Sequence, residues 1–127
     1  MAAAVSDYVP AYEQRGKLKK EMLGDEWELK LKKNRDILAS IDKDGISVIG
    51  FKAEMDRENA LNNAKKMLES KKLDAVCLNI LEDAKSFGTV DNQVDFITHD
   101  GVVELPRAEK LLLSLAIVKE AKKLQEA

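Results

Sequence analysis

Two predominantly apolar runs, residues 46–51 and 75–81, enclose a segment in which apolar side chains recur at helical spacing. A strand that is apolar on both faces needs a sheet whose two faces are covered by other elements. The enclosed segment has Asp56 as a candidate N-cap and a polar face, which is typical of an amphipathic helix lying on such a sheet. Strand, helix and strand joined by short links predict two parallel strands of an α/β fold.

The segments before this unit predict a loop, a strand and a short helix. Residues 8–24 mix Pro, Gly and charged side chains with little periodicity, which predicts a mobile loop. Residues 27–32 alternate apolar and charged side chains, the pattern of a strand with one packed face. Asn34 or Asp36 can cap a short helix with Ile37, Leu38 and Ile41 facing inward, ending near residues 44–45.

The C-terminal part predicts a hairpin and a long helix. Asp100-Gly101 is the strongest hairpin signal in the chain and lies between strand-like residues 93–99 and 102–105. A final helix, apolar nearly all round in its middle, is expected from Arg107 to about Gln125 after an opening proline. The expected fold is therefore α/β: a Rossmann-like, mostly parallel sheet flanked by helices, with a C-terminal antiparallel hairpin, in a single domain over residues 1–127.

Composition excludes several classes of site. The 21 Lys and Arg residues nearly balance the 23 Asp and Glu residues, and a net charge of −2 provides no overall field that would draw nucleic acid or anionic lipid. One cysteine, Cys77, and one histidine, His99, exclude a disulfide framework and zinc motifs that need several such ligands. No apolar window is long enough for a membrane helix and no signal peptide is visible, so we expect a cytoplasmic protein.

The first residues predict an incomplete element. The run from Met1 to Val5 ends in Ser6 and Asp7, which resembles the end of a buried parallel strand. A strand that starts in its middle leaves backbone groups that need partners from elsewhere, so we expect the domain to be truncated at its N-terminus.

Several residues are candidates for binding an anion or a nucleotide. Lys17, Lys19 and Lys20 bring three ammonium groups together in the loop, where they can neutralise a polyanion or form an ordinary solvated charge run. Asp7, at a strand end, can bind a base, a sugar or a divalent cation, or simply cap a turn.

The other candidates have equally simple structural interpretations. Residues 34–36 present free backbone N–H groups at a helix start, as any capped helix does. The ring of Phe51 can stack on a base or pack in the core, and Lys71 lies near a helix end where the helix dipole favours a cation. Cys77 is expected to be an inert core thiol, and His99 has no catalytic partner visible in the sequence.

The order and spacing of these motifs resemble one family, the phosphopantothenoylcysteine synthetase domain of the bacterial coenzyme A biosynthesis flavoprotein. The resemblance covers essentially the whole chain, and the Lys-x-Lys-Lys and Asn-x-Asp-Ile elements at this separation are specific together, although each alone is weak. The motifs that carry it are residues 2–8, 17–20, 34–38, 50–54, 71–74, Asn79, 87–88, 91–92, 100–101, 105–106 and Lys110.

This resemblance implies a reaction and its reactants. Members of the family join 4'-phosphopantothenate to cysteine by activating the carboxylate with CTP to an acyl-cytidylate, which the cysteine amine then attacks; Mg²⁺ accompanies the nucleotide. The resemblance makes Lys17 the catalytic lysine of a mobile flap and places Asp7 near the metal as well as the nucleotide. The residues it implies at the nucleotide are Ala3, Asp7, Lys17, Asn34, Arg35, Asp36, Ile37, Phe51 and Lys71.

The resemblance also sets expectations for the rest of the molecule. The chain looks like the C-terminal half of a CTP-dependent ligase domain, so we expect it to be inactive alone, to bind no FMN, and to form a homodimer or higher homo-oligomer. Met67 stands where family members usually have a second lysine four positions before Lys71, which places one phosphate contact in question. The alternative hypothesis is a non-catalytic nucleotide-binding or oligomerisation module with the same fold.

Overall fold

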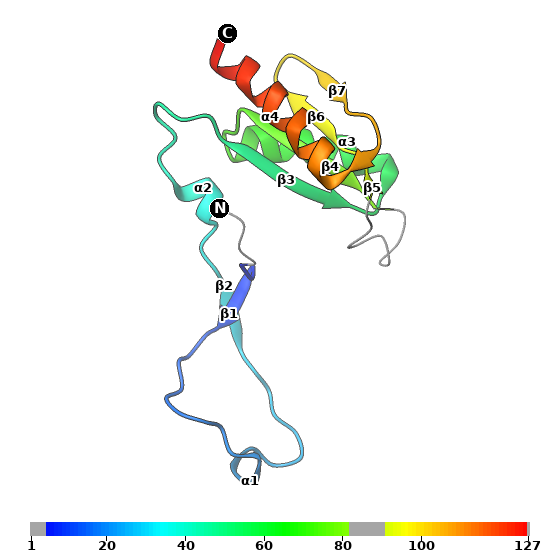
Figure 1. Ribbon diagram of the computed structural model, residues 1–127. Helices are drawn as coiled ribbons and strands as arrows, with labels where there is room; N and C mark the ends of the chain where they lie inside the picture. The colour runs from blue at the N-terminus through cyan, green and yellow to red at the C-terminus, as the bar shows by residue number, and fades with distance from the viewer. Residues whose placement is uncertain (1–4, 82–90, 127) are drawn as a thin grey trace. The chain divides into compact units, whose positions relative to one another are not determined.

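The computed structural model of the chain describes residues 5–81 and 91–126 (Figure 1). It separates into two compact units, Met1–Ser40 and Ile41–Ala127. Each unit has its own strands and helices, and the expectation of a single domain over residues 1–127 stays a prediction. Most of the run expected to be the end of a buried strand, residues 1–4, lies outside the described residues.

The first unit is built on a short antiparallel pair. Strand β1 (Tyr8–Pro10) pairs with β2 (Leu31–Lys33), and helix α1 (Lys20–Leu23) lies at the far end of the long connection between them (Figure 1). The strand predicted over residues 27–32 was wrong in its extent, because its partner strand ends at Pro10 and pairing stops after one further hydrogen bond, from Ala11 N to Lys30 O at 2.8 Å.

The short helix predicted after β2 exists as α2 (Ile37–Ser40), and Asp36 caps it. The Asp36 carboxylate accepts a hydrogen bond from the backbone N–H of Ala39 at 3.0 Å, which satisfies one of the donors left free at a helix start. Ile37 and Ile41 are exposed, so the prediction that they face inward was wrong: α2 has a single turn and ends at Ser40, before Ile41.

The second unit is a four-stranded sheet in the order β3-β4-β6-β7. Strands β3 (Ile49–Glu54) and β4 (Ala75–Ile80) are parallel, while β6 (Asp95–Thr98) pairs antiparallel with both β4 and β7 (Val102–Glu104). The α/β class and the C-terminal hairpin are confirmed. Within the described strands the sheet is mixed rather than mostly parallel, because the hairpin contributes two of its four strands.

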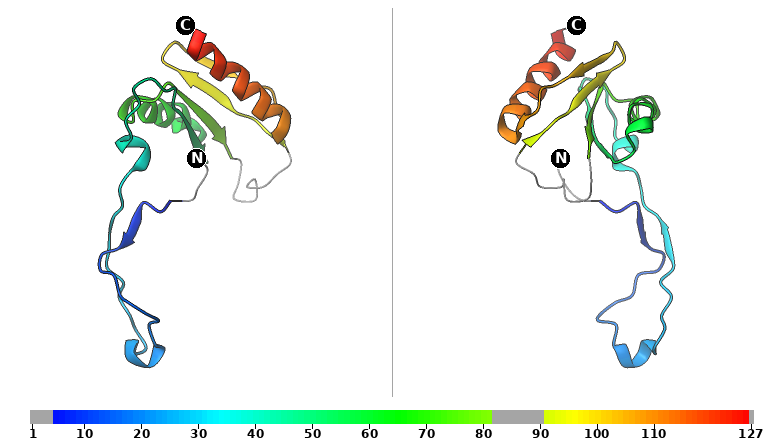
Figure 2. Two further views of the ribbon diagram at one scale, coloured as in Figure 1. Left: turned by 60° about the vertical axis from the view of Figure 1, so that its left-hand side comes forward. Right: turned by 90° about the vertical axis from the view of Figure 1, so that its right-hand side faces the viewer.

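The two long helices cover opposite faces of this sheet (Figure 2). Helix α3 (Arg57–Ser70) begins at the predicted cap Asp56 and buries Ala60, Ala64 and Leu68. Helix α4 (Lys110–Glu126) packs Leu113 into a cluster on the other face, whose remaining buried members are Ala75, Cys77, Val94, Phe96 and Leu105. Because successive side chains of β4 point to opposite faces of the sheet, β4 contributes residues to the hydrophobic cores under both α3 and α4.

Strand β3 departs from its prediction. It was expected to be buried on both faces, yet Phe51 is 70% exposed. The physical reason is position: β3 is the end strand of the described sheet and pairs there with β4 alone. An apolar run indicates a strand but does not say where the strand stands in the sheet.

The final helix starts later than predicted. Ala108–Glu109 forms a short strand, β8, paired antiparallel with β5 (Asp91–Asn92), so α4 begins at Lys110 instead of Arg107. In the described part of the chain, no helix combines the length and apolar character needed to cross a membrane.

Candidate functional site

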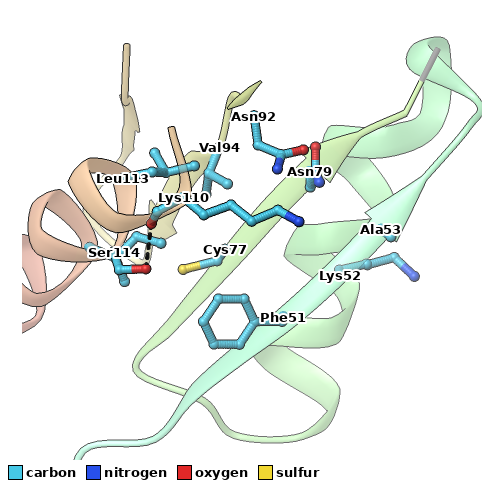
Figure 3. Close-up of a pocket in the computed structure, with 11 residues that line it drawn as sticks. Phe51, Lys52, Ala53, Cys77, Asn79, Asn92, Val94, Lys110, Leu113 and Ser114 are labelled. Atoms are coloured by element: carbon cyan, nitrogen blue, oxygen red, sulfur yellow. Dashed lines mark hydrogen bonds between the residues drawn. The ribbon is translucent and has the colours of Figure 1, made fainter. Parts of the chain in front are cut away.

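A pocket of about 420 Å³ opens between β3, β4 and α4 in the second unit (Figure 3). We call it the Phe51 pocket; its size is ordinary for a small-molecule site. The residues that line it are Phe51, Lys52, Ala53, Cys77, Asn79, Asn92, Val94, Lys110, Leu113, Ser114 and Ile117.

The parallel register of β3 and β4 creates this pocket. Phe51 pairs with Cys77 and Ala53 with Asn79, so these four side chains share one face, which α4 covers only in part. They occupy the middle and the carboxyl ends of the two strands, where open α/β sheets bind ligands. The small Ala53 leaves room beside the exposed Phe51 ring.

The floor of the pocket is apolar. Cys77, Val94 and Leu113 are buried there. Burial raises the pKa of the Cys77 thiol to about 12, so the group stays protonated near neutral pH. As predicted, Cys77 is a core thiol rather than a nucleophile.

Polar groups surround the floor. Asn79 and Asn92 are half-buried, and Lys110 is exposed at the first position of α4. The Ser114 hydroxyl donates to the Lys110 carbonyl at 2.6 Å and is therefore used within the helix. Lys52 points to the other side of the sheet, where its ammonium forms an ion pair with Glu54 at 2.9 Å.

The first unit brings together a second group of predicted residues. The backbone N–H of Asn34 donates to Asp7 O at 2.7 Å, and its side-chain amide donates to Ser6 O at 2.9 Å. The Asn34 side-chain oxygen accepts from Arg35 N at 2.8 Å, and Arg35 Nε donates to Ser40 Oγ at 2.8 Å. Asp7, Asn34 and Arg35 thus lie around the end of the β1–β2 pair.

The other predicted site residues of this unit take no part in these hydrogen bonds. Asp36 and Ile37 adjoin the cluster through α2, with the Asp36 carboxylate occupied as a cap. Lys17 lies in the connection between β1 and α1, is exposed, and makes no hydrogen bond or ion pair with any described residue. Ala3 lies outside the described residues.

Lys71 lies at the opposite end of the sheet from the pocket's polar rim. It is the C-cap residue of α3 and precedes the amino end of β4, whereas Asn79 stands near the carboxyl end. The structure therefore brings Phe51, but not Lys71, to the Phe51 pocket. His99 has a structural contact: its Nε2 lies 3.1 Å from Leu73 O.

Sequence reasoning left Asn79, Asn92 and Lys110 out of the candidate site residues, although all three belong to the motifs of the family resemblance. Their common location depends on strand register and on the placement of α4, which local patterns do not reveal. A signal was present nonetheless: Asn79 interrupts an apolar run just before a strand end, where ligand-binding side chains are expected.

The described residues contain no cluster of three or more His, Cys, Asp or Glu side chains that could enclose a metal ion. Magnesium, however, is usually bound by one or two carboxylates together with substrate phosphates. The exposed carboxylate of Asp7 fits that mode of binding.

Comparison with known proteins gives a consistent result. Residues 1–124 match the model of the family described as DNA/pantothenate metabolism flavoprotein C-terminal domain. The chain is 35% identical over 122 residues to the coenzyme A biosynthesis bifunctional protein CoaBC of Vibrio vulnificus, covering 93% of this chain and 30% of that protein. The chain thus spans about 30% of the length of the curated relatives it matches.

Solved structures agree on the fold. The crystal structure of the C-terminal domain of CoaBC superposes with a TM-score of 0.70 at 28% identity, over 98% of this chain and 52% of that one. A Cab2 variant in complex with phosphopantothenate-cysteine superposes with a TM-score of 0.65 at 21% identity, over 98% and 44% of the two chains, and shows the shared fold alone.

Proposed function

Because the chain belongs to the family of DNA/pantothenate metabolism flavoprotein C-terminal domains, we propose that it is the nucleotide-binding part of a ligase in coenzyme A biosynthesis. The ligase joins 4'-phosphopantothenate to L-cysteine. The observation that carries the proposal is the Phe51 pocket, where an exposed aromatic ring and several polar side chains meet beside parallel strands. The relatives named CoaBC support the assignment to coenzyme A biosynthesis.

The proposed reaction has two steps. The carboxylate of 4'-phosphopantothenate attacks the α-phosphate of CTP, forming an acyl-cytidylate and releasing pyrophosphate. The cysteine amine then attacks the acyl carbon, an amide bond forms, and CMP leaves. In the first step a carboxylate approaches a triphosphate, so fixed positive charge is needed to offset the repulsion.

Lys17 supplies that charge in our proposal. Its ammonium has no partner among the described residues and stands on the long connection between β1 and β2. Phe51 packs against the cytidine, and Asp7 is the residue that would hold Mg²⁺, which when bound shields the phosphates. The remaining proposed nucleotide contacts are Ala3, Asn34, Arg35, Asp36, Ile37 and Lys71. Lys71 does not line the Phe51 pocket, so its proposed contact is with a part of the nucleotide that extends beyond the pocket.

We expect the 127-residue chain to bind the nucleotide without completing the ligation, because it spans about 30% of the relatives it matches. We also expect it to bind no FMN, since the proposed reaction involves no electron transfer. Adding CTP, 4'-phosphopantothenate and cysteine should therefore produce no phosphopantothenoylcysteine with this chain alone.

Calorimetric titration of the chain with CTP and Mg²⁺ tests the proposal. Binding should weaken in Lys17→Ala and in Asp7→Ala and stay unchanged in Lys122→Ala, which removes an exposed lysine of α4. Titration without Mg²⁺ should reduce the effect of Asp7→Ala. Equal CTP affinity in all four proteins would contradict the assignment of the nucleotide site.

A second candidate function, an oligomerisation module, is favoured by one observation. Leu111, Leu115 and Val118 follow one another at helical spacing on α4 and are 67%, 60% and 54% exposed. Such an apolar stripe is typical of a helix covered by another chain. Light scattering should then detect a homodimer that Leu115→Glu dissociates and Lys119→Glu preserves; a monomer at every concentration would exclude this function.

A further inference from the structure

A second cavity, of about 290 Å³, lies on the other face of the sheet from the Phe51 pocket. Leu78 follows Cys77 along β4 and therefore points away from α4, toward the face that α3 covers, and Asp95 is its register partner on β6. We call this cavity the Asp95 pocket. The residues that line it are Arg57, Leu78, Ile80, Gln93, Asp95, Glu104 and Arg107.

The register of the β6–β7 hairpin places two carboxylates side by side in this pocket. Asp95 pairs directly with Glu104, and like charges in opposed positions destabilise a strand pair. The side-chain amide of Gln93 donates to the Glu104 carboxylate at 2.5 Å. The Asp95 carboxylate, in contrast, has no hydrogen bond or ion pair with any residue in the described ranges 5–81 and 91–126.

Asp95 is also partly removed from water. Its side chain is half-buried, and burial, followed by the charge of Glu104, raises its pKa. The sheet thus holds a carboxylate that is partly desolvated, lacks a counter-charge and has a like charge beside it. An arrangement that costs stability and faces a cavity is typical of a binding site.

The pocket also contains positive groups. Arg57 is the first residue of α3, and Arg107 follows β7. Arg107 is exposed, and its guanidinium forms no ion pair within the part of the chain that the structure describes. The buried side chain of Leu78 contributes an apolar floor between these polar groups. Charges of both signs therefore surround one small cavity.

These surroundings select the ligand. A molecule that fills the pocket displaces the water that still reaches Asp95, so it must supply a positively charged donor in exchange. A simple anion has no such donor and is repelled by two carboxylates. A simple amine has the donor, but it is repelled by the two guanidiniums and gains nothing from Arg107. A molecule that carries both charges meets an opposite charge for each of them.

We propose that the Asp95 pocket binds a small amphoteric molecule with one ammonium and one carboxylate, the ammonium between Asp95 and Glu104 and the carboxylate toward Arg107. The volume of the pocket suits a ligand of the size of an amino acid. This inference goes beyond the proposed ligase function, because it concerns the opposite face of the sheet and requires no nucleotide.

Titrations of the full chain followed by ¹⁵N-correlated spectra test the inference. The amphoteric probes are 4-aminobutyrate and L-alanine, which differ in the spacing of their two charges; butylamine and butyrate each keep only one charge. At least one amphoteric probe should shift the backbone amide signals of Asp95 and Glu104 and the side-chain amide signal of Gln93. It should bind more tightly than either single-charge probe.

Three variants assign the contacts. Asp95→Asn should weaken binding of the amphoteric probe about tenfold or more, as expected for the loss of a charge-assisted hydrogen bond. This variant removes a like-charge opposition, so unfolding does not explain a loss of binding. Arg107→Gln should weaken the amphoteric probe about two- to fivefold, as expected for an exposed ion pair, and should not weaken butylamine. The matched control is Asp100→Asn, in the turn of the same hairpin but outside the pocket, where Asn-Gly keeps the turn and the affinity should not change.

Four results would overturn the inference. They are the absence of binding by both amphoteric probes, equal affinity for butylamine, unchanged affinity in Asp95→Asn, and signal shifts at Asn79 and Asn92 instead of the Asp95 pocket. The proposed function is tested separately by CTP: a chain that binds an amphoteric probe through Asp95 but does not bind CTP would refute the ligase assignment and leave the Asp95 pocket in place.

Discussion

Leucine-to-alanine substitutions at two positions of α4 test how this helix packs. Leu113 is 5% exposed and belongs to the cluster beneath the Phe51 pocket, whereas Leu115 is 60% exposed. Each substitution removes the same three carbon atoms from the same helix. Any difference in stability therefore reports the surroundings of the side chain rather than the chemistry of the change.

The structure sets the expected magnitudes. Transfer of three buried carbons to water costs about 2.4 kcal/mol, and a cavity left beside Val94 and Phe96 raises the cost of Leu113→Ala to about 3–4 kcal/mol. Leu115 is mostly in water already, and alanine has the better helix propensity, so Leu115→Ala should cost less than about 1 kcal/mol.

Equilibrium urea denaturation followed by far-ultraviolet circular dichroism measures both values, because α3 and α4 supply most of the described helix. Trp27 fluorescence is unsuitable, since that residue belongs to the first unit. Equal destabilisation by the two substitutions would refute the packing described here. If the cost of Leu115→Ala appears only at high protein concentration, the exposed stripe is buried between copies of the chain.

Three further predictions concern titratable groups. Cys77, whose pKa burial raises to about 12, should react with iodoacetamide near pH 8 roughly 10³-fold more slowly than an ordinary thiol, and mass spectrometry should show full reaction once the protein is denatured. Burial, and to a smaller extent the neighbouring Glu104, raise the pKa of Asp95. The folded state therefore loses stability as the pH rises from the pKa of Asp95 in the unfolded chain through its pKa in the folded chain. Asp95→Asn should raise the urea midpoint at neutral pH and leave it unchanged near pH 3, where Asp95 is protonated in both states. Hydrogen bonds from the side chain and backbone of Asn59 lower the pKa of Asp56, so its contribution is complete above the ordinary Asp pKa and is lost as pH falls through the lowered value. Asp56→Ala should therefore reduce the thermal midpoint at neutral pH, the loss should vanish in acid, and Asp56→Ser should restore much of it.

The elements predicted correctly are those whose signals are local. Helix α3 follows from a cap at Asp56 and a helical repeat, and both act within a few residues of each other. The β6–β7 hairpin follows from Asp100-Gly101 between two strand-like runs. In these segments the information needed for the prediction is contained in a window of about twenty residues.

The predictions that failed depended on distant partners. The alternation over residues 27–32 indicates a strand with one packed face. The observed strand β2 extends only as far as β1 pairs with it. Phe51 has the sequence surroundings of a core residue and becomes exposed because β3 stands at the end of the described sheet. The β5–β8 pair joins segments that carry no strand pattern of their own, and without it the start of α4 could not be predicted.

The Phe51 pocket couples stability to ligand recognition through α4. Leu113 is buried in the apolar floor of the pocket, so it holds α4 against the sheet beside the Phe51 ring. Leu113→Ala should then weaken CTP binding under conditions where circular dichroism still shows a folded chain, although Leu113 has no polar group that could bind a nucleotide. The double variant Leu113→Ala, Phe51→Ala should bind CTP little more weakly than Phe51→Ala alone, because both changes act on the same contact between the ring and the cytidine. Additive losses would mean that Leu113 affects the nucleotide by another route, such as direct contact with it.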